Sequence, residues 1–308
     1  MRKKKKGLII TAVTVLAIAL VLSTLFIIFN LRAPVIIVTE QYFIDLYGEK
    51  RFKKDINNAS ITLLRPVKAA VIANDAGDDI APYTIAEISS KPYCVLFPRR
   101  FAQSARLYRE QNPEAVIILL EGRLPINTDV SGLTVYGTDT ENDYYKAGLI
   151  AATIAASASD EETKGKIAVF LMPGTARDAF LRGIKEEGTE YETKFYTSYT
   201  DISSTPALAC VILAGTGGEI LDKIPEIPVI AFSWLDPSMM TDNVILVIDD
   251  SPLAQLVQAV NMAVAVKAQE AEGEGEKTGG EERIGSKFIV SERKIFDSTL
   301  LQNISKMK

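Results

Sequence analysis

Polar and aromatic residues follow the apolar runs of this 308-residue sequence, and their types define the chemistry that the chain could perform. If the runs are strands of parallel sheets, the residues after their carboxyl ends lie where such sheets bind ligands. In the first half these residues are Gln41, Tyr42, Asn74, Asp75, Arg99, Arg100, Glu121 and Arg123. In the second half they are Asp139, Thr175, Asp201, Thr216, Trp234, Asp236, Asp249 and Asp250. Aromatic, amide and charged groups together suit a small polar molecule held by stacking and bidentate hydrogen bonds.

Several of these candidates also have a purely structural explanation. Thr175 and Asp178 match a capping box, in which the threonine hydroxyl accepts a backbone N–H at the start of a helix. The sequence GTGG at 215–218 could be a tight turn between a strand and a helix, or it could let backbone amides approach a ligand oxygen. Arg99 and Arg100 could be solvated surface residues. Both explanations stay open at each of these positions.

Catalytic chemistry has little support in the sequence. The chain contains no histidine, which removes the usual general base and the commonest transition-metal ligand. The loop MPGTARDAF at 172–180 lacks the phosphate-binding motifs, and the serines of FSWLD and DISSTP are not flanked by glycines as in a nucleophile elbow. Asp249 and Asp250 are adjacent on an expected strand, so their carboxylates point to opposite faces. We therefore expect no enzyme activity, no cofactor and no metal site.

The composition describes a folded protein with a mild negative charge. Apolar residues make up 47% of the chain, and the formal net charge is -5. That acidity argues against a nucleic-acid partner, which usually requires a basic surface. Cys94 and Cys210 both lie in apolar, strand-like runs, and we expect two buried thiols with no disulfide between them.

Ten short runs rich in Val and Ile alternate with amphipathic segments. The runs are 35–39, 68–74, 93–97, 115–121, 133–139, 166–172, 193–199, 209–215, 228–234 and 243–249. Helical patterns occupy 102–111, 144–156, 176–187 and 253–268. Runs that are apolar on both faces, with helices between them, are typical of parallel sheets covered by helices on both sides. Ten strands exceed an ordinary open sheet, so we predict an α/β fold with two doubly wound parallel-sheet lobes that divide near Gly137.

The segment 267–287 differs from the rest of the chain. It is acidic and rich in glycine, and it has no aliphatic periodicity, which predicts a solvated, mobile loop. The following KFIVSERKIF, at 287–296, predicts a last strand or a hairpin.

The N-terminal 32 residues combine a basic cluster with an uninterrupted apolar run from Leu8 to Phe29. As a helix this run would extend about 33 Å, enough to cross a hydrocarbon core of about 30 Å. The residues after the run fit a signal-peptide cleavage site badly, and no cysteine follows for lipoprotein processing. The lysines at 3–6, against a single Arg32, place the N-terminus in the cytoplasm. We expect a single-pass anchor in the inner (cytoplasmic) membrane with the bulk of the chain in the periplasm; a long, cleaved signal peptide is the alternative.

Four stretches carry a resemblance to a known family. YGTDTENDYYKAGLIAATIAA (136–156) is similar to a crossover into a second lobe and its first helix, and KGKIAVFLMPGTARDAFLRGIKEEG (164–188) is similar to the first βα unit of that lobe. ACVILAGTGGEILDKI (209–224) is similar to a strand and its glycine-rich turn, and VIDDSPLAQLVQAVNMAV (247–264) to the return into the first lobe. The chain thereby resembles the type 1 periplasmic binding proteins, which include sugar receptors and the nucleoside-binding basic membrane lipoproteins.

The resemblance implies two lobes joined by three crossing segments, with a ligand between them and closure by hinge bending. It implies a first lobe of 33–136 with 252–283 and a second lobe of 137–251 with 284–308, after the anchor at 1–32. It also assigns ligand contacts to Gly215, Thr216 and Asp236. The chain departs from the family in two ways: TEQYFIDLYG follows the first run in place of the ligand loop of the nucleoside binders, and a lipobox is missing.

These observations favour a membrane-anchored, extracytoplasmic solute-binding protein. Its expected ligand is a small polar molecule of the sugar or nucleoside class, and its expected partner is the permease of an ABC-type importer. The alternative is a ligand-free scaffold or interaction module of the cell envelope. A regulator of the related repressor class is disfavoured, because an apolar segment occupies the place of its helix-turn-helix.

Overall fold

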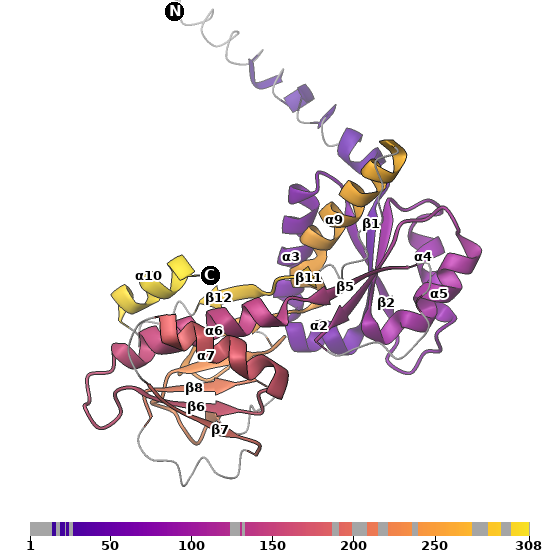
Figure 1. Cartoon of the computed structure of the whole chain (residues 1–308). Coiled ribbons are helices and arrows are strands. Elements are labelled where there is room, and N and C mark those ends of the chain that lie inside the picture. Colours follow the sequence, from indigo (N-terminus) through magenta and orange to yellow (C-terminus); the bar gives the residue numbers. More distant parts are fainter. Residues whose placement is uncertain are drawn as a thin grey trace, which may run out of the picture.

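The computed structural model shows a chain folded into two lobes that lie next to each other, with a short helical stretch at 27–31 before the first strand (Figure 1). The structure describes residues 27–123, 133–186, 191–198, 208–214, 221–235, 240–272, 283–290 and 297–307. It also describes Val130 and residues 14–16, 19–21 and 23–24. Each lobe is built around its own six-stranded sheet.

Lobe 1 contains a sheet in the order β11-β5-β4-β3-β1-β2, in which all the neighbouring strands are parallel. Its strands are β1 (Val35–Glu40), β2 (Val67–Ile72), β3 (Cys94–Pro98), β4 (Ile117–Gly122), β5 (Thr134–Thr138) and β11 (Arg283–Ile284). Its helices are α2 (Gln41–Tyr47), α3 (Glu49–Thr62), α4 (Ile80–Ile88), η1 (Arg99–Phe101), α5 (Ala102–Gln111) and α9 (Pro252–Glu272).

Helices cover both faces of the lobe 1 sheet. Val35 and Ile37 of β1 belong to one core with residues of α2, α3 and α9, whereas Ile36 and Val38 belong to a second core with residues of α4 and α5. Successive side chains of a strand point to opposite faces, so a strand buried on both sides must be apolar throughout. This is why the run at 35–39 contains almost no polar residue.

Lobe 2 contains a sheet in the order β12-β10-β9-β8-β6-β7, which is parallel except for the antiparallel edge strand β12. Its strands are β6 (Lys166–Phe170), β7 (Glu192–Tyr196), β8 (Cys210–Leu213), β9 (Val229–Phe232), β10 (Val244–Asp249) and β12 (Lys287–Val290). Its helices are α6 (Thr140–Ala156), η2 (Gly174–Ala176), α7 (Arg177–Glu186) and α10 (Ser298–Met307).

Two glycines let α6 and α7 pack in direct backbone contact. A Cβ atom at Gly148 would lie 2.1 Å from the carbonyl oxygen of Phe180, and a Cβ atom at Gly183 would lie 2.0 Å from that of Tyr145. No side chain fits at either position without moving one helix away from the other. The pair therefore forms a tightly packed layer on one face of the lobe 2 sheet.

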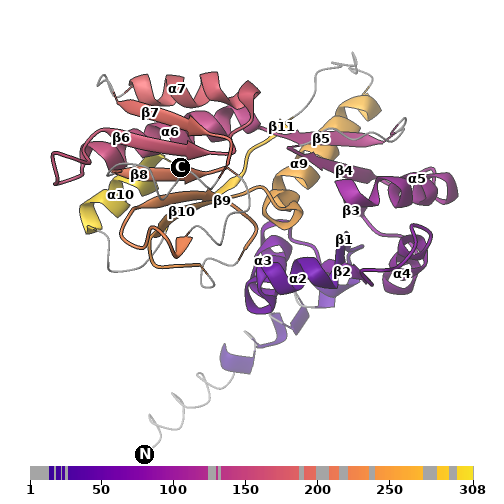
Figure 2. The ribbon, with the colours of Figure 1, turned by 90° about the horizontal axis from the view of Figure 1, so that it is seen from below.

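Three chain segments connect the lobes, between β5 and α6, between β10 and α9, and between β11 and β12 (Figure 2). The backbone N–H of Asp139 donates to the carbonyl of Ile284 over 2.9 Å, which joins the first crossing to the third. The Gln255 amide donates to Thr138 Oγ1 over 3.1 Å and to the Ile284 carbonyl over 3.2 Å. These bonds hold the three crossings together at one place.

Each of the ten predicted runs overlaps one of the strands β1 to β10, and the four predicted helices overlap α5, α6, α7 and α9. The prediction for 267–287 was wrong in part, because α9 continues to Glu272 and β11 and β12 occupy 283–284 and 287–290. The residues 273–282 lie outside the described part. Gly137, near which a division was predicted, lies within β5 of lobe 1.

The run from Leu8 to Phe29 is described only in part, so the predicted anchor lies largely outside the described residues. Among the residues that are described, no helix combines the length and the apolar character needed to cross a membrane. Cys94 lies in lobe 1 and Cys210 in lobe 2; both are buried and free, and burial raises the pKa of each thiol.

Candidate functional site

A cavity of about 430 Å³ lies at the carboxyl ends of β1, β3 and β4, and we call it the cleft cavity. Lobe 1 supplies nearly all of its lining, while Trp234 and Asp250 of lobe 2 form the opposing wall. β3 lies between β1 and β4 in the sheet, and carboxyl ends of parallel strands meet at one edge, which brings the three strand-end segments together. The cavity has the size of ordinary small-molecule sites, which are about 300–1,000 Å³.

Aromatic side chains form one part of the cleft cavity. Tyr42, Phe43, Phe101 and Trp234 all contribute to the lining. The Trp234 ring meets Phe43 edge-on with centroids 5.6 Å apart, and the indole N–H donates to Asp250 over 2.7 Å. Trp234 nevertheless remains 42% exposed, so a face of the ring is available to a solute.

Charged side chains form another part of the lining, and most of them are paired. Arg100 forms an ion pair with Glu40 and also donates to the carbonyl of Asn74 over 2.9 Å. Arg123 lies 3.0 Å from Asp250 through its Nε atom. Arg99 also lines the cavity, and its side chain has no hydrogen bond or ion pair to any residue that the structure describes.

Arg123 occupies the centre of the junction between the lobes. Its guanidinium lies 4.4 Å from the ring centroid of Phe232, which stacks on Tyr144 at 4.5 Å. Nη2 of Arg123 is 3.9 Å from the buried carboxylate of Asp143. Burial raises the pKa of Asp143 to about 6, although a hydrogen bond from Ser286 and the positive charge of Arg123 lower it in part.

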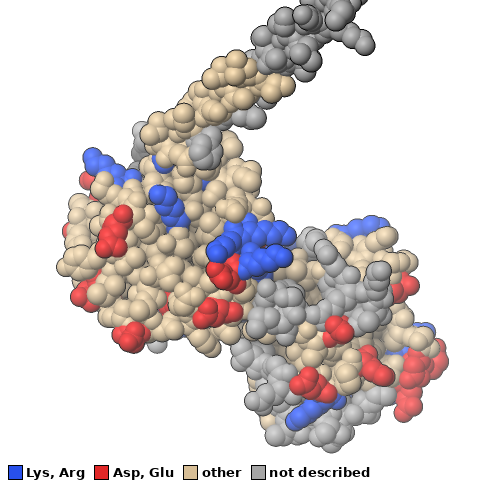
Figure 3. Space-filling model, turned by 180° about the vertical axis from the view of Figure 1, so that it is seen from behind, with Lys and Arg blue, Asp and Glu red and all other residues tan. Residues whose placement is uncertain are grey.

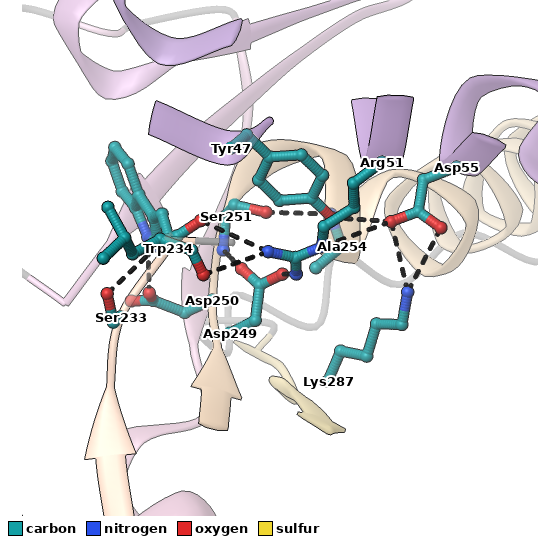
Figure 4. Close-up of polar contacts among 11 residues, drawn as sticks. Tyr47, Arg51, Asp55, Ser233, Trp234, Asp249, Asp250, Ser251, Ala254 and Lys287 are labelled. Carbon is teal, nitrogen blue, oxygen red and sulfur yellow. Dashed lines mark hydrogen bonds and ion pairs between the residues drawn. The ribbon is translucent and has the colours of Figure 1, made fainter. Parts of the chain in front are cut away.

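A second arginine joins the lobes outside the cleft cavity. Arg51 of α3 forms an ion pair with Asp249, and its Nη1 atom donates to the main-chain carbonyls of Trp234 and Leu235 over 3.3 Å (Figure 4). Gly48 has a φ of 87°, a left-handed conformation that favours glycine, and it lets α2 turn into α3 just before Arg51.

The neighbours of Arg51 hold its guanidinium in place. It lies over the ring of Tyr47 at 3.8 Å, and the Tyr47 hydroxyl donates to Asp55 over 2.7 Å. Lys287 of lobe 2 reaches the same Asp55 carboxylate at 3.3 Å (Figure 4). We call Tyr47, Arg51, Asp55, Asp249 and Lys287 the interlobe clasp. Burial raises the pKa of Asp249, and the charge of Arg51 opposes that rise.

Basic side chains also gather on the outside of lobe 1, beside its junction with lobe 2 (Figure 3). α3 contributes exposed Lys50, Lys53 and Lys54, while Phe52 on its other side is buried in the core. Lys53 pairs with Glu49 over 2.5 Å at the surface. The outer surface of α3 is therefore positively charged.

The structure brings part of the predicted site together. Four predicted ligand contacts line the cleft cavity, namely Tyr42, Arg99, Arg100 and Trp234. Three further residues that follow strand ends also line it, namely Glu121, Arg123 and Asp250. The adjacent carboxylates of Asp249 and Asp250 do not converge, since the first binds Arg51 and the second Arg123. That divergence follows from the opposite directions of successive residues on a strand.

The other predicted contacts do not line the cleft cavity. Gln41 donates to Asp45 within α2, and exposed Asn74 accepts from the backbone N–H of Tyr42 over 3.1 Å. Exposed Asp75 is on the loop after β2. Asp249 is fully buried in the clasp.

Asp139 and Thr175 lie at the start of helices of lobe 2 and not at the cleft cavity. Asp139 is the N-cap of α6 and accepts from the backbone of Asn142 over 3.3 Å. Thr175 is exposed within the short helix η2, and the predicted capping box was wrong, because α7 begins only at Arg177. Four further predictions fall on residues outside the described part of the chain, namely Asp201, Gly215, Thr216 and Asp236.

Sequence reasoning missed Arg51, Asp55, Phe43 and Asp143. Arg51 and Asp55 lie in the middle of a helix, where nothing in the local sequence distinguishes them from surface charges. Asp143 had one available signal, because it is an acidic residue next to Tyr144 in a helix that is otherwise apolar toward the sheet. A buried carboxylate in such a position needs a partner.

No family model matches the chain, and no curated protein matches it either. Solved structures do align with it over most of its length. A transcriptional activator of the comK gene from Bacillus halodurans aligns with a TM-score of 0.52 and 14% identity, covering 89% of this chain and 95% of that one. The arabinose-binding protein AraP from Geobacillus stearothermophilus aligns with a TM-score of 0.51 and 14% identity, covering 90% of this chain and 99% of that one.

The chain therefore has the two-lobed fold of the type 1 periplasmic binding proteins, as the resemblance predicted. At 14% identity the likeness concerns the fold alone. The two aligned proteins are named as a transcriptional activator and a binding protein.

Proposed function

We propose that this chain is a solute-binding protein that captures a small polar molecule of the sugar or nucleoside class between its lobes. The observation that supports this most directly is the cleft cavity of about 430 Å³, with Trp234 and Asp250 of lobe 2 facing the strand ends of lobe 1. Both the position, beyond the carboxyl ends of parallel strands, and the mixture of aromatic and charged lining suit such a ligand.

The arrangement supplies two kinds of recognition. The exposed faces of Tyr42 and Trp234 can stack on a sugar ring or a base, and the carboxylates of Glu121 and Asp250 can accept hydrogen bonds from hydroxyl groups. Trp234 already contacts Phe43 of lobe 1, and because the crossings meet at one place, lobe 2 can rotate about them once the ion pair of Arg51 with Asp249 is broken.

We further propose that the N-terminal segment anchors the protein in the cytoplasmic membrane, that the lobes are periplasmic, and that they deliver the solute to an ABC-type permease. The apolar run from Leu8 to Phe29 and the lysines before it support the anchor and its orientation. Alkaline extraction should leave the protein in the membrane fraction, and protease added outside spheroplasts should digest the lobes. Release by alkali or protection from the protease would contradict this placement.

Trp234 is the only tryptophan of the chain, and it lines the cleft cavity, so its fluorescence reports directly on the site. The full chain in detergent should show a saturable change in tryptophan emission with at least one member of a panel of sugars, nucleosides and amino acids. Isothermal titration should give the same affinity. Trp234→Phe removes the signal but should keep most of the heat of binding. No response to the whole panel in either measurement would overturn solute capture.

An interaction module of the cell envelope is the second candidate function. The interlobe clasp favours it, because the side chains of Arg51 and Asp249 join the lobes directly. Cross-linking of the full chain in cells, followed by identification of the linked membrane proteins, tests this candidate. Stable partners together with no solute response would favour the module over the solute-binding protein.

A further inference from the structure

We propose that the solute carries an anionic group, a carboxylate or a phosphate, and that Arg99 binds this group. The inference rests on the proposed solute-binding function and adds the charge of the ligand to it. It starts from the three arginines of the cleft cavity, Arg99, Arg100 and Arg123, which differ in what surrounds their guanidinium groups.

Two of these three arginines are already neutralised by the protein. Arg100 forms an ion pair with Glu40, and Arg123 lies 3.0 Å from Asp250. Within the described residues the guanidinium of Arg99 has neither an ion pair nor a hydrogen bond, although Arg99 is partly buried in the wall of the cavity. A partly desolvated guanidinium without a counter-charge is unfavourable, and an anionic ligand would supply the missing charge.

The other arginines near Arg99 in the sequence show that the lack of a partner is specific to it. Arg109 of α5 donates to the carbonyl of Ala115 over 3.0 Å, and Arg106 lies 3.7 Å from Glu110 on the same helix. These side chains have partners on the outside of lobe 1, away from the cavity. Only Arg99 of this group both lines the cavity and lacks a partner among the described residues.

The position of Arg99 is fixed by the sheet. It directly follows Pro98, the last residue of β3, and Pro98 is the register partner of Leu120 on β4. Glu121 follows Leu120, so the two charged residues start from neighbouring strand ends, yet no ion pair joins them in the described structure. A guanidinium held at a strand end can present two parallel N–H groups, which match a carboxylate or a phosphate.

Two of the three carboxylates of the cavity are already paired with other arginines and do not cancel this positive charge. Glu40 and Asp250 already face Arg100 and Arg123, and Asp250 accepts a further hydrogen bond from the Trp234 indole. Glu121 also lines the cavity and can accept hydrogen bonds from hydroxyl or amino groups of the same solute. The site therefore suits a molecule with hydroxyl groups and one anionic group.

The test compares solutes that differ by one anionic group, using the full chain in detergent and both titration calorimetry and Trp234 fluorescence. The pairs are D-glucose with D-glucuronate, D-ribose with ribose 5-phosphate, and adenosine with AMP. The carboxylate and phosphate arms distinguish the two kinds of anion. We expect the anionic member of at least one pair to bind about 10- to 100-fold more tightly, the range of a charge-assisted hydrogen bond.

Variants of Arg99 link that preference to the side chain. Arg99→Gln should remove the preference within the pair, while Arg99→Lys should keep part of it, because lysine keeps the charge and loses the planar fork. Arg182→Gln is the matched control, since Arg182 pairs with Glu141 at the exposed surface of lobe 2 and does not line the cavity. It should bind every solute as the wild type does.

The possible outcomes separate this inference from the function on which it rests. Equal binding within each pair, tighter binding of the neutral member, or a preference that survives in Arg99→Gln would overturn the anionic ligand and leave solute capture intact. No binding of any solute would overturn both. If Arg99→Gln does not fold, the wild-type pairs and Arg99→Lys still decide the question.

Discussion

Arg51 and Arg123 both extend from lobe 1 to lobe 2, where they bind the neighbouring carboxylates of Asp249 and Asp250. Their surroundings differ. Arg51 has an ion pair, two main-chain carbonyls and the ring of Tyr47. Arg123 has one close carboxylate, and its Nε and Nη2 atoms are buried without a hydrogen bond of good geometry.

The different surroundings of Arg51 and Arg123 indicate different roles at the interface between the lobes. The Arg51 pair is largely buried and lies outside the cleft cavity, so its interactions serve to hold the lobes together. Arg123 lines the cavity and keeps unused hydrogen-bonding capacity. We infer that the clasp sets the arrangement of the lobes, whereas Arg123 is available to respond to a solute.

The largest expected effect comes from Arg51→Gln. It leaves the carboxylate of Asp249, which is fully buried, without its counter-charge, and loss of one partner of a buried pair costs about 3–5 kcal/mol. The free energy of unfolding, measured by denaturant titration of the full chain, should fall by this amount. Adding Asp249→Asn should restore part of it.

Lys53→Gln is the matched control for this change. Its side chain is 70% exposed and pairs with Glu49 at the surface, so the cost should stay below about 1 kcal/mol. Similar losses for Arg51→Gln and Lys53→Gln would show that the clasp does not hold the lobes together.

A smaller effect depends on pH and involves Asp143. Its pKa in the folded protein is about 6, against an ordinary value of 3.8, so the folded state binds this proton more tightly than the unfolded state. The stability that protonated Asp143 contributes is fully present below about pH 4, and it is lost as the pH rises to about 6. Relative to wild type, the free energy of unfolding of Asp143→Asn should rise by up to about 3 kcal/mol between these pH values, because asparagine does not ionise.

Urea titrations of both proteins at several pH values measure this gain. Asp75→Asn is the control, since Asp75 is an exposed aspartate on the loop after β2. If the difference in unfolding free energy between Asp143→Asn and wild type does not change with pH, the positive charge of Arg123, at 3.9 Å, fully offsets the cost of burying the Asp143 carboxylate.

Arg123→Gln should cost less stability than Arg51→Gln, about 1–2 kcal/mol. Asp250 keeps its hydrogen bond from the Trp234 indole, so its carboxylate is not left without a partner. The same variant should weaken solute binding by about tenfold, as measured by Trp234 fluorescence. A loss of stability as large as that of Arg51→Gln would remove the distinction between the two arginines.

The smallest expected effect is that of Lys287→Ala at the edge of the clasp. Its side chain is 45% exposed and lies 3.3 Å from Asp55, so the pair should contribute less than about 1 kcal/mol. The effect should disappear at 1 M salt, where the screening length is about 3 Å. A larger effect that persists at high salt would extend the rigid part of the clasp to Lys287.

The fold was predictable because each strand is buried on both faces and therefore appears as an uninterrupted apolar run. The runs at 35–39 and 243–249 are of this kind, and the rule that ligands bind at strand ends then placed Tyr42, Arg99, Arg100 and Trp234 in the cavity. The helices α3 and α10 gave weaker signals, because their apolar residues cover only one side.

The interlobe contacts were not predictable in the same way. Arg51 and Asp249 are 198 positions apart in the sequence and meet only after both sheets have formed. The strand-end rule also treats every residue after a strand alike, so it could not separate Asp249, which the clasp buries, from Asp250, which reaches the cavity. Such distinctions depend on the tertiary structure and not on local pattern.

The position of α9 in the sequence bears on how the protein is made. Leu253, Leu256 and Val260 of α9 cover one face of the lobe 1 sheet, on which Val35 and Ile37 also lie. A ribosome must therefore synthesise all five parallel strands of lobe 2 before that face can be covered completely, because α2 and α3 cover only part of it. The usual order of domain folding, with the N-terminal unit first, does not apply here. A growing chain presents a long-lived apolar surface, and chaperones that recognise such surfaces should bind nascent lobe 1 until α9 has been translated.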